Sequence, residues 1–225
     1  MNILFEDNHI IAVNKSNSEI VQGDKTGDEA LSDTVKAYIK KKYKKPGDVY
    51  LGVVHRIDRP VSGVVIFART SKAATRLSKM FLEKEIKKTY WAIVKQLPES
   101  DSGRLVHHMI KNQEKNRSSA YDTPRKKSKE AVLTYKLVSS SANYHLLEIE
   151  LETGRHHQIR CQLAKIGCPI RGDLKYGAAR SNKGGGVNLH ARKIEFTHPV
   201  TKEFISILAP VPKEDNLWNE FQNVM

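Results

Sequence analysis

The sequence predicts an α+β domain with a mainly antiparallel sheet. Three features of its 225 residues indicate this fold class. Short apolar runs of strand length recur along the chain, few intervening segments have helical periodicity, and several neighbouring runs are separated only by short turns. A doubly wound parallel sheet would need a helix between nearly every pair of strands, and those helices are missing. We expect one domain that spans residues 1–225.

The first part of the chain predicts paired strands and a helix. Residues 3–14 alternate short apolar runs with polar, turn-like ones, which indicates strands. In residues 29–44 the apolar positions follow helical spacing while lysines occupy most of the rest, which predicts an amphipathic helix with a basic outer face. The apolar positions of this helix are Leu31, Val35, Tyr38 and Ile39.

The next part predicts two buried strands around a polar loop. Residues 50–55 and 63–68 are apolar, β-branched runs that suit buried strands. Thr70 or Ser71 is suited to cap a following helix, whose apolar positions lie on one side. These positions are Ala74, Leu77, Met80 and Phe81, and residues 90–94 then predict another strand.

The second half is expected to be rich in strands. Residues 111–129 are polar and basic, so we expect a loop there that stays disordered until a partner binds. The remaining segments predict strands at 131–138 and 144–151, a helix at 155–166 ended by Gly167, a hairpin of 187–196 with 203–208, and a short C-terminal helix carrying Leu217, Trp218 and Phe221.

Charge and composition limit the classes of partner. The formal net charge is +13 and the pI is about 9.6, which favours nucleic acid or an anionic membrane surface. No apolar run approaches the roughly 20 residues of a membrane span, and the first residues lack the features of a signal peptide, so we expect a cytoplasmic protein. The basic segments 40–45 and 125–129 are candidates for phosphate contacts or, equally, solvated faces.

The cysteines and histidines do not predict a disulfide or a metal centre. Cys161 and Cys168 fall in one short segment, so a stapling disulfide is not expected. His157 and Cys161 lie one helical turn apart, yet no second pair follows to complete a tetrahedral site. We therefore expect no metal.

One aspartate stands out chemically. Asp58 lies in the loop between the two buried strands, with Arg56 and Arg59 beside it. Neighbouring guanidinium groups should hold this carboxylate ionised, and an ionised, rigidly placed aspartate is suited to act as a nucleophile or base. An exposed Arg–Asp ion pair with no chemical role explains the same residues equally well.

Four motifs resemble those of one enzyme family. His55-Arg56-Ile57-Asp58, followed by Ser62-Gly63 and an apolar strand, resembles the signature of RluA-family RNA pseudouridine synthases, with Ile57 for the usual leucine and Val61 for the usual threonine. The other three matches follow in the family's order: Lys88-Thr89-Tyr90-Trp91-Ala92, then Gly154-Arg155-His156-His157-Gln158-Ile159-Arg160 with Gly172-Asp173, then Leu189-His190-Ala191-Arg192 with His198-Pro199. The chain departs from the family at Asn14-Lys15-Ser16-Asn17-Ser18, where relatives have Asn-Lys-Pro-x-Gly.

The resemblance implies a fold and a reaction. It implies a pseudouridine-synthase domain with flanking helices and a central RNA-binding cleft, without the small RNA-binding module that many relatives carry in front. The substrate would be ribosomal or transfer RNA, and the reaction needs no metal or cofactor. Asp58 would be the catalytic carboxylate, Arg160 its ionic partner, and Tyr90 the residue that lies against the uracil and takes a proton from its carbon 5.

The resemblance also implies RNA-contacting residues. Arg56 would fill the gap left by a flipped nucleotide. Further RNA contacts are expected from His55, Arg59, Arg155, His157 and Gln158. We expect a monomer with no obligatory protein partner. Two other classes remain open: a non-catalytic RNA-binding or ribosome-assembly protein on the same fold, and a metal-dependent nuclease, for which the sequence offers no cluster of acidic ligands.

Overall fold

The structure is a computed structural model that describes residues 1–24 and 27–221. The chain divides into two compact units. Unit 1 comprises residues 1–88 and 191–211, and unit 2 comprises residues 89–190 and 212–225. Both consist of strands with few helices, and the strand pairs described below are antiparallel, which confirms the predicted α+β class.

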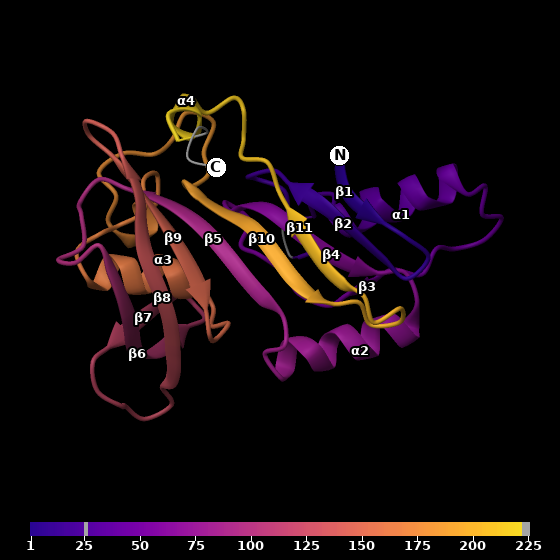
Figure 1. Cartoon of the computed structure of the whole chain (residues 1–225), viewed down its shortest axis with the longest axis horizontal. Coiled ribbons are helices and arrows are strands. Elements are labelled where there is room, and N and C mark those ends of the chain that lie inside the picture. Colours follow the sequence, from indigo (N-terminus) through magenta and orange to yellow (C-terminus); the bar gives the residue numbers. More distant parts are fainter. Residues whose placement is uncertain (25–26, 222–225) are drawn as a thin grey trace. The chain divides into compact units, whose positions relative to one another are not determined.

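Unit 1 is a sheet accompanied by two helices (Figure 1). The sheet order is β1-β2-β4-β10, with β3 paired to β4 and β11 paired to β10. The strands are β1 (Asn2–Glu6), β2 (Ile10–Lys15), β3 (Gly52–Val53), β4 (Ser62–Ala68), β10 (Leu189–Thr197, of which residues 191–197 belong to this unit) and β11 (Phe204–Leu208), and the helices are α1 (Leu31–Lys42) and α2 (Ser71–Leu82).

Apolar patterning explains these elements. Every residue of β4 is buried, as its continuous apolar run predicts for a strand covered on both faces. The hydroxyl of Thr70 accepts a hydrogen bond from the Ala73 amide at 3.2 Å and caps α2. Helix α1 buries Leu31, Val35 and Ile39, so the predicted apolar face is confirmed for these residues.

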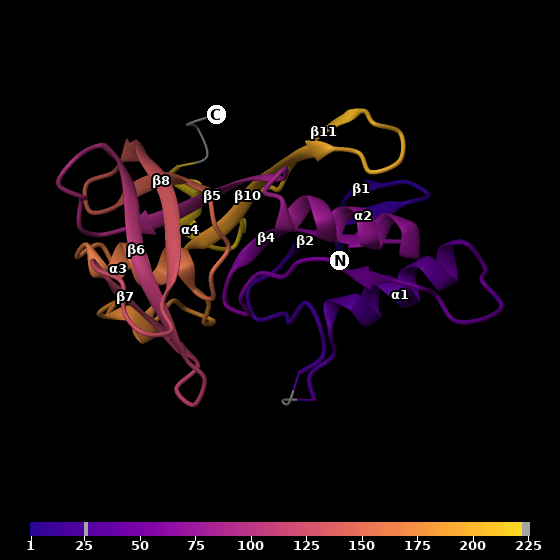
Figure 2. The same cartoon turned by 90° about the horizontal axis from the view of Figure 1, so that it is seen from below.

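Unit 2 is a second run of antiparallel strands (Figure 2). Its order is β5-β9-β8-β6-β7. The strands are β5 (Lys87–Val94, of which residues 89–94 belong to this unit), β6 (Ser102–Asn112), β7 (Arg117–Tyr121), β8 (Lys129–Ser140) and β9 (His145–Leu151). Its helices are α3 (Gln158–Lys165), the short 3-10 helix η1 (Leu174–Tyr176) and α4 (Asn216–Asn219), where Trp218 packs edge-on against His190.

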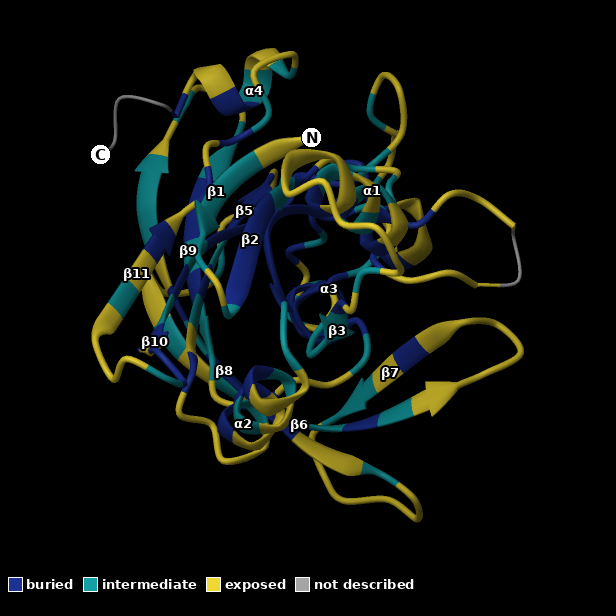
Figure 3. Ribbon diagram, turned by 90° about the vertical axis from the view of Figure 1, so that its right-hand side faces the viewer, coloured by how far each residue is buried: buried dark blue, intermediate teal, exposed yellow. Residues whose placement is uncertain are grey.

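The predicted disordered loop at 111–129 is wrong. Strand β7 pairs with the end of β6 in an antiparallel hairpin, from Asn112↔Arg117 to His108↔Tyr121. The hairpin escaped prediction because it has no buried apolar run: β7 is exposed or half-buried at every position except Ser118 (Figure 3). Ladder hydrogen bonds and polar contacts hold this hairpin, and these do not show in hydrophobic patterning.

Two predicted boundaries also differ from the structure. The strand expected at 50–55 is reduced to Gly52–Val53, because the residues after it turn into the loop that carries Asp58. The helix expected from residue 155 begins only at Gln158, because His157 has a left-handed backbone with φ of 55° that a helix cannot include. Among the helices of residues 1–24 and 27–221, none has the length and apolar character needed to cross a bilayer.

Candidate active site

The loop between β3 and β4 holds Asp58 in a tight turn. The amide of Val61 donates to the Asp58 backbone oxygen at 3.0 Å, and the side chains of Ile57 and Val61 on either side are buried. Asp58 itself is half-buried, whereas Arg56 and Arg59 are exposed. Two apolar anchors thus fix the backbone on both sides of the carboxylate, while the two arginines face solvent.

A buried lysine braces this turn. The Lys15 side chain is only 1 % exposed, and its ammonium donates to the backbone oxygens of Ser16, Glu19 and Arg59 at 2.8, 2.8 and 3.0 Å. Burial lowers the pKa of Lys15 to about 8, although the charges of Glu19 and Asp58 act to raise it. Lys15 therefore joins the loop after β2 to the Asp58 turn and brings a positive charge near the carboxylate.

His55 anchors the start of the same loop. Its Nε2 accepts a hydrogen bond from the Ile66 amide at 2.9 Å, and its ring stacks on Phe81 with centroids 4.6 Å apart. Burial, and secondarily the charge of Lys88, lowers the pKa of His55 to about 3. The ring is therefore neutral at physiological pH and carries its proton on Nδ1.

Gly63 closes the loop where two strands come into close contact. Its φ of 117° is one that residues with a side chain rarely adopt. A Cβ at this position would lie 2.3 to 2.7 Å from backbone atoms of Ala191 in β10. The close approach of β4 and β10 therefore explains why the motif has glycine at position 63.

In unit 2, Arg160 of α3 forms a buried bidentate ion pair with Asp173. The Nε–Oδ2 distance is 2.7 Å and the Nη2–Oδ1 distance is 2.9 Å, and both side chains are almost completely buried. The guanidinium also lies 5.2 Å from the centre of the Tyr176 ring. These contacts fix the orientation of Arg160.

His157 and Tyr176 form a second buried contact beside Arg160. The Tyr176 hydroxyl accepts the Ser118 amide at 2.8 Å and lies 3.0 Å from His157 Nδ1. The contact fixes the His157 ring against Tyr176, whichever of the two groups donates. Burial, with the charge of Arg160 next in effect, lowers the pKa of His157 to about 2, so this ring is neutral too.

Gln158 holds the turn that precedes α3. It is buried, and its Oε1 accepts from the Thr153 hydroxyl at 2.8 Å and the Arg155 amide at 2.9 Å. Its Nε2 donates to the Val132 oxygen at 3.0 Å. Arg155 is exposed, with its Nε donating to the Glu130 oxygen at 2.7 Å.

Tyr90 lies on β5, opposite Ile149 of β9, and is half-buried. Unit 1 thus holds Asp58, His55, Arg56 and Arg59, and unit 2 holds the remaining predicted site residues: Tyr90, Arg155, His157, Gln158 and Arg160. The carboxylate that pairs with Arg160 within unit 2 is Asp173. The expected pairing of Arg160 with Asp58, and the RNA contacts of these residues, stay predictions.

Sequence reasoning missed three residues that support the site. Asp173 lies in the third motif, Tyr176 lies three residues after it, and Lys15 lies outside the four motifs. Lys15 is in the Asn14-Lys15 segment where the resemblance weakens, and Asp173 follows Gly172 in the third motif. The sequence signal that could have identified Asp173 is a carboxylate in the same motif as Arg160.

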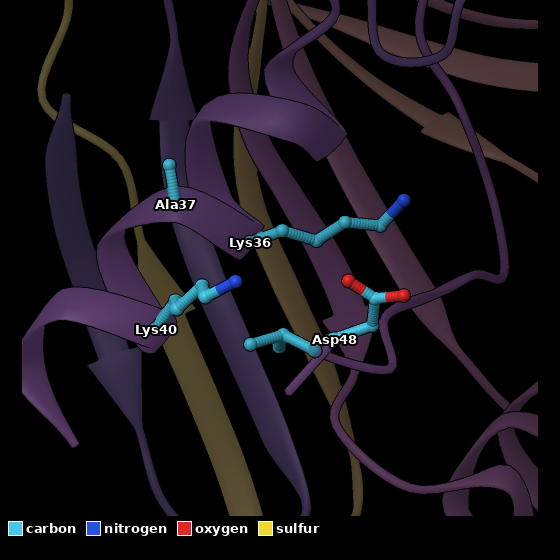
Figure 4. Close-up of a pocket in the computed structure, with 5 residues that line it drawn as sticks. Lys36, Ala37, Lys40 and Asp48 are labelled. Atoms are coloured by element: carbon cyan, nitrogen blue, oxygen red, sulfur yellow. The ribbon is translucent and has the colours of Figure 1, made fainter. Parts of the chain in front are cut away.

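Unit 1 also has a surface pocket, and none of the predicted site residues lines it. This cavity of about 290 Å³ is lined by Lys36, Ala37, Lys40, Asp48 and Val49. Figure 4 shows the amino groups of Lys36 and Lys40 and the carboxylate of Asp48 around it. Within the described part of the chain, no three His, Cys, Asp or Glu side chains are placed to hold a metal ion.

Comparison with known proteins relates this chain to one enzyme family. Residues 9–165 match the family model described as RNA pseudouridylate synthase. The chain is 33% identical over 230 residues to the ribosomal large subunit pseudouridine synthase D of Xylella fastidiosa, covering 95% of this chain and 67% of that protein. It is 28% identical over 241 residues to the tRNA pseudouridine synthase C of Vibrio parahaemolyticus, covering 98% and 93%. The structure of human RNA pseudouridylate synthase domain containing 4 shares the fold, with a TM-score of 0.79, 22% identity, and 95% and 89% of the two chains covered.

Proposed function

Since the chain belongs to the RNA pseudouridylate synthase family, we propose that Asp58 is the catalytic carboxylate with which it converts uridines in ribosomal or transfer RNA to pseudouridine. The observation that supports this assignment best is the Asp58 turn, which is held by buried Ile57 and Val61 and by the ammonium of Lys15. A carboxylate on so constrained a backbone is preorganised for one position relative to a bound nucleotide.

The reaction is an isomerisation in which atoms balance without a co-reactant. The bond from uracil N1 to ribose C1′ breaks, the base turns in the site, and a bond from C5 to C1′ forms. Nitrogen 1 gains a proton and C5 loses one. Asp58 starts the reaction either by adding to C1′ or by removing the proton from C2′. We assign to Tyr90 the removal of the C5 proton as aromaticity returns, and to Arg160 electrostatic support of the carboxylate during the reaction.

The target nucleotide must leave its stack before this chemistry occurs. Arg56 is exposed on the same turn as Asp58, and we assign to it the filling of the space that the flipped nucleotide leaves. A guanidinium can stack on bases and contact phosphates together. Arg59, whose guanidinium lies 2.6 Å from the Asp28 carboxylate, and Arg155 are further cations for RNA contact.

The relatives with assigned substrates are named for ribosomal large subunit RNA and for tRNA. We propose an RNA of one of these two classes as substrate and the cytoplasm as the compartment. The protein is expected to act as a monomer, which sedimentation of the purified chain with and without RNA would test. Mapping pseudouridines in total RNA from cells with and without the gene assigns the target positions.

The decisive experiment measures tritium release from RNA that carries [5-³H]uridine. Wild-type protein should release tritium, and Asp58→Asn should release none while it still binds the RNA. Asp33→Asn is the matched control, because Asp33 is exposed on α1 and its only described ion pair is with the exposed Lys36. Release by Asp58→Asn at the wild-type rate would disprove the catalytic assignment and favour a non-catalytic RNA-binding role.

A further inference from the structure

The tip of the β6–β7 hairpin is docked firmly onto the segment that carries Arg160. The Ser118 amide donates to Tyr176, the Ser118 hydroxyl donates to the His156 backbone oxygen at 2.8 Å, and the Cys161 thiol donates to the Ser118 oxygen at 3.3 Å. Lys175 of η1 donates to the Asn116 oxygen at 3.0 Å. The tip is therefore a fixed part of unit 2 although most of its residues are exposed.

Docking brings several cations together. Lys111 and Arg117 come from the hairpin, and Lys175 comes from η1. The Arg117 guanidinium lies 5.2 Å from the centre of the ring of Tyr176, the residue that follows Lys175. Lys111 lies directly opposite Ser118 in the β6–β7 ladder, so its side chain is on the same face of the hairpin as that of Ser118. Lys175 donates to the Asn116 oxygen in the turn of the same hairpin. We call Lys111, Arg117 and Lys175 the tip surface.

His156 helps to fix the tip in place. Its Nδ1 lies 3.0 Å from Ser118 Oγ, its backbone oxygen accepts from the Ser118 hydroxyl, and its Nε2 lies 3.0 Å from Asn116 Oδ1. The ring also stacks on His157 with centroids 3.8 Å apart. The docking contacts therefore involve the side chain of His156 as well as its backbone.

No acid within the described residues compensates the charge of the tip surface. Across residues 1–24 and 27–221, Lys111, Arg117 and Lys175 have no carboxylate within ion-pair distance, and Asp173 is engaged by Arg160. The hairpin turn carries one acid, Glu114, and one base, Lys115. The neighbouring His157 is neutral. A fixed cluster of cations with no acid partner is suited to an external anion.

We propose that the tip surface binds a phosphate group of the RNA backbone. The proposal rests on the proposed function, since it gives the RNA substrate of the same enzyme a second point of attachment outside the Asp58 loop. Because the cations are held in place by the docking contacts, binding does not have to order a mobile loop. Lys111, Arg117 and Lys175 neutralise the phosphate.

The test measures RNA affinity separately from chemistry. Fluorescence anisotropy with a labelled RNA is recorded in the full-length Asp58→Asn background at salt concentrations from about 0.05 to about 0.3 M. Lys111→Ala and Arg117→Ala should each weaken binding by about 3- to 10-fold and reduce the slope of log K against log salt by about 0.7 to 0.9 for each phosphate that is no longer neutralised. Lys111 is decisive, because its exposed side chain makes no described contact on which folding depends.

Lys136→Ala is the matched control. Lys136 is an exposed lysine of unit 2, and it is already paired with Glu148 at 3.0 Å, so its removal should leave the salt slope unchanged. A Lys111→Ala protein whose affinity and slope equal those of Lys136→Ala would overturn the proposal.

Activity distinguishes the two proposals. With Asp58 intact, the RNA concentration for half-maximal single-turnover tritium release should rise in the tip-surface variants by the same factor as their loss of affinity, while Lys136→Ala should behave as wild type. A lack of tritium release from wild-type protein would defeat the proposed function and leave the binding comparison intact. A fall in the saturated rate of Lys111→Ala with unchanged affinity would count against a phosphate-binding role.

Discussion

Arg160 and Asp173 form a bidentate ion pair in the interior of unit 2, with Nε–Oδ2 and Nη2–Oδ1 distances of 2.7 and 2.9 Å. Replacement of Asp173 by Asn removes the charge that compensates the guanidinium. Breaking a buried pair in this way typically costs about 3 to 5 kcal/mol, and we expect a loss of that size in the free energy of unfolding, measured with urea.

Glu152→Gln is the control, since Glu152 forms a bidentate pair with Arg104 on the surface, where about 1 kcal/mol or less is expected. A loss under about 1 kcal/mol for Asp173→Asn would contradict the prediction. The double variant Arg160→Met with Asp173→Leu should recover most of the stability, because neither charge then remains buried. It should not recover tritium release if Arg160 supports the chemistry directly.

The titration of Lys15 leads us to expect that activity falls at alkaline pH while the protein stays folded. Its ammonium donates three hydrogen bonds to backbone oxygens, and with a pKa of about 8 it loses a donor and its charge above that pH. Single-turnover activity should therefore fall as pH rises through about 8. The pKa in the folded state lies below the ordinary value of 10.5, so the unfolded chain binds more protons between pH 8 and 10.5, and this titration by itself increases stability with pH there.

Urea unfolding alongside the activity profile separates the two effects. Lys15→Gln should have reduced activity and no step near pH 8. The same step in the Lys15→Gln profile would assign it to another group, and a parallel fall in wild-type stability would assign it to unfolding.

Gly63 tests whether the close approach of β4 and β10 is essential. Alanine there would place a Cβ within 2.7 Å of the Ala191 backbone at a φ of 117°, and neither backbone is a flexible end that can move aside. We expect Gly63→Ala to lower the free energy of unfolding by about 2 to 4 kcal/mol and to lower activity through the adjoining loop.

Gly47→Ala is its control, because no atom lies within 4 Å of the added Cβ. That change should shift the free energy of unfolding by less than about 0.5 kcal/mol. Equal stability of the two variants, measured by the same urea titration, would show that the strands can separate at Ala191 without cost.

Prediction from sequence succeeded where burial determines structure. Strand β4 and helix α1 have apolar patterns that packing alone explains, and both lie close to their predicted bounds. Asp58 was identifiable because it belongs to a motif, and the match to residues 9–165 confirms the family that this motif indicated. Hydrophobic period and turn chemistry were sufficient for these elements.

Prediction from sequence failed where polar contacts between residues distant in the chain determine the structure. The β6–β7 hairpin depends on the hydrogen bonds of Ser118 and Asn116 to His156 and Tyr176, which no local pattern shows. The bracing by Lys15 is similar, because a lone lysine after a strand normally indicates a solvated charge. Both features support the candidate site, and polar networks of this kind require the three-dimensional structure to be found.

Two buried neutral histidines predict that acid destabilises the fold. The pKa values of His55 and His157 are lowered to about 3 and about 2, chiefly by burial, from an ordinary value of 6.5. Below pH 6.5 the unfolded chain therefore binds protons at these positions that the folded chain does not bind. Stability should fall as pH falls below about 6.5, by about 1.4 kcal/mol per pH unit for each histidine once pH is well under that value.

Urea unfolding at pH values of about 7.5, 6.0 and 5.0 measures this slope. His55→Gln and His157→Asn should each make the slope shallower by up to that amount, and asparagine suits the left-handed backbone at position 157. Gly47→Ala is again the control, because it adds no titratable group and its Cβ meets no atom within 4 Å, so its slope should equal that of wild type. A full wild-type slope in His55→Gln would contradict the prediction. It would mean that the ring of His55 takes up protons in the folded state. The hydrogen bond from the Ile66 amide to Nε2 opposes this unless the Asp58 loop opens.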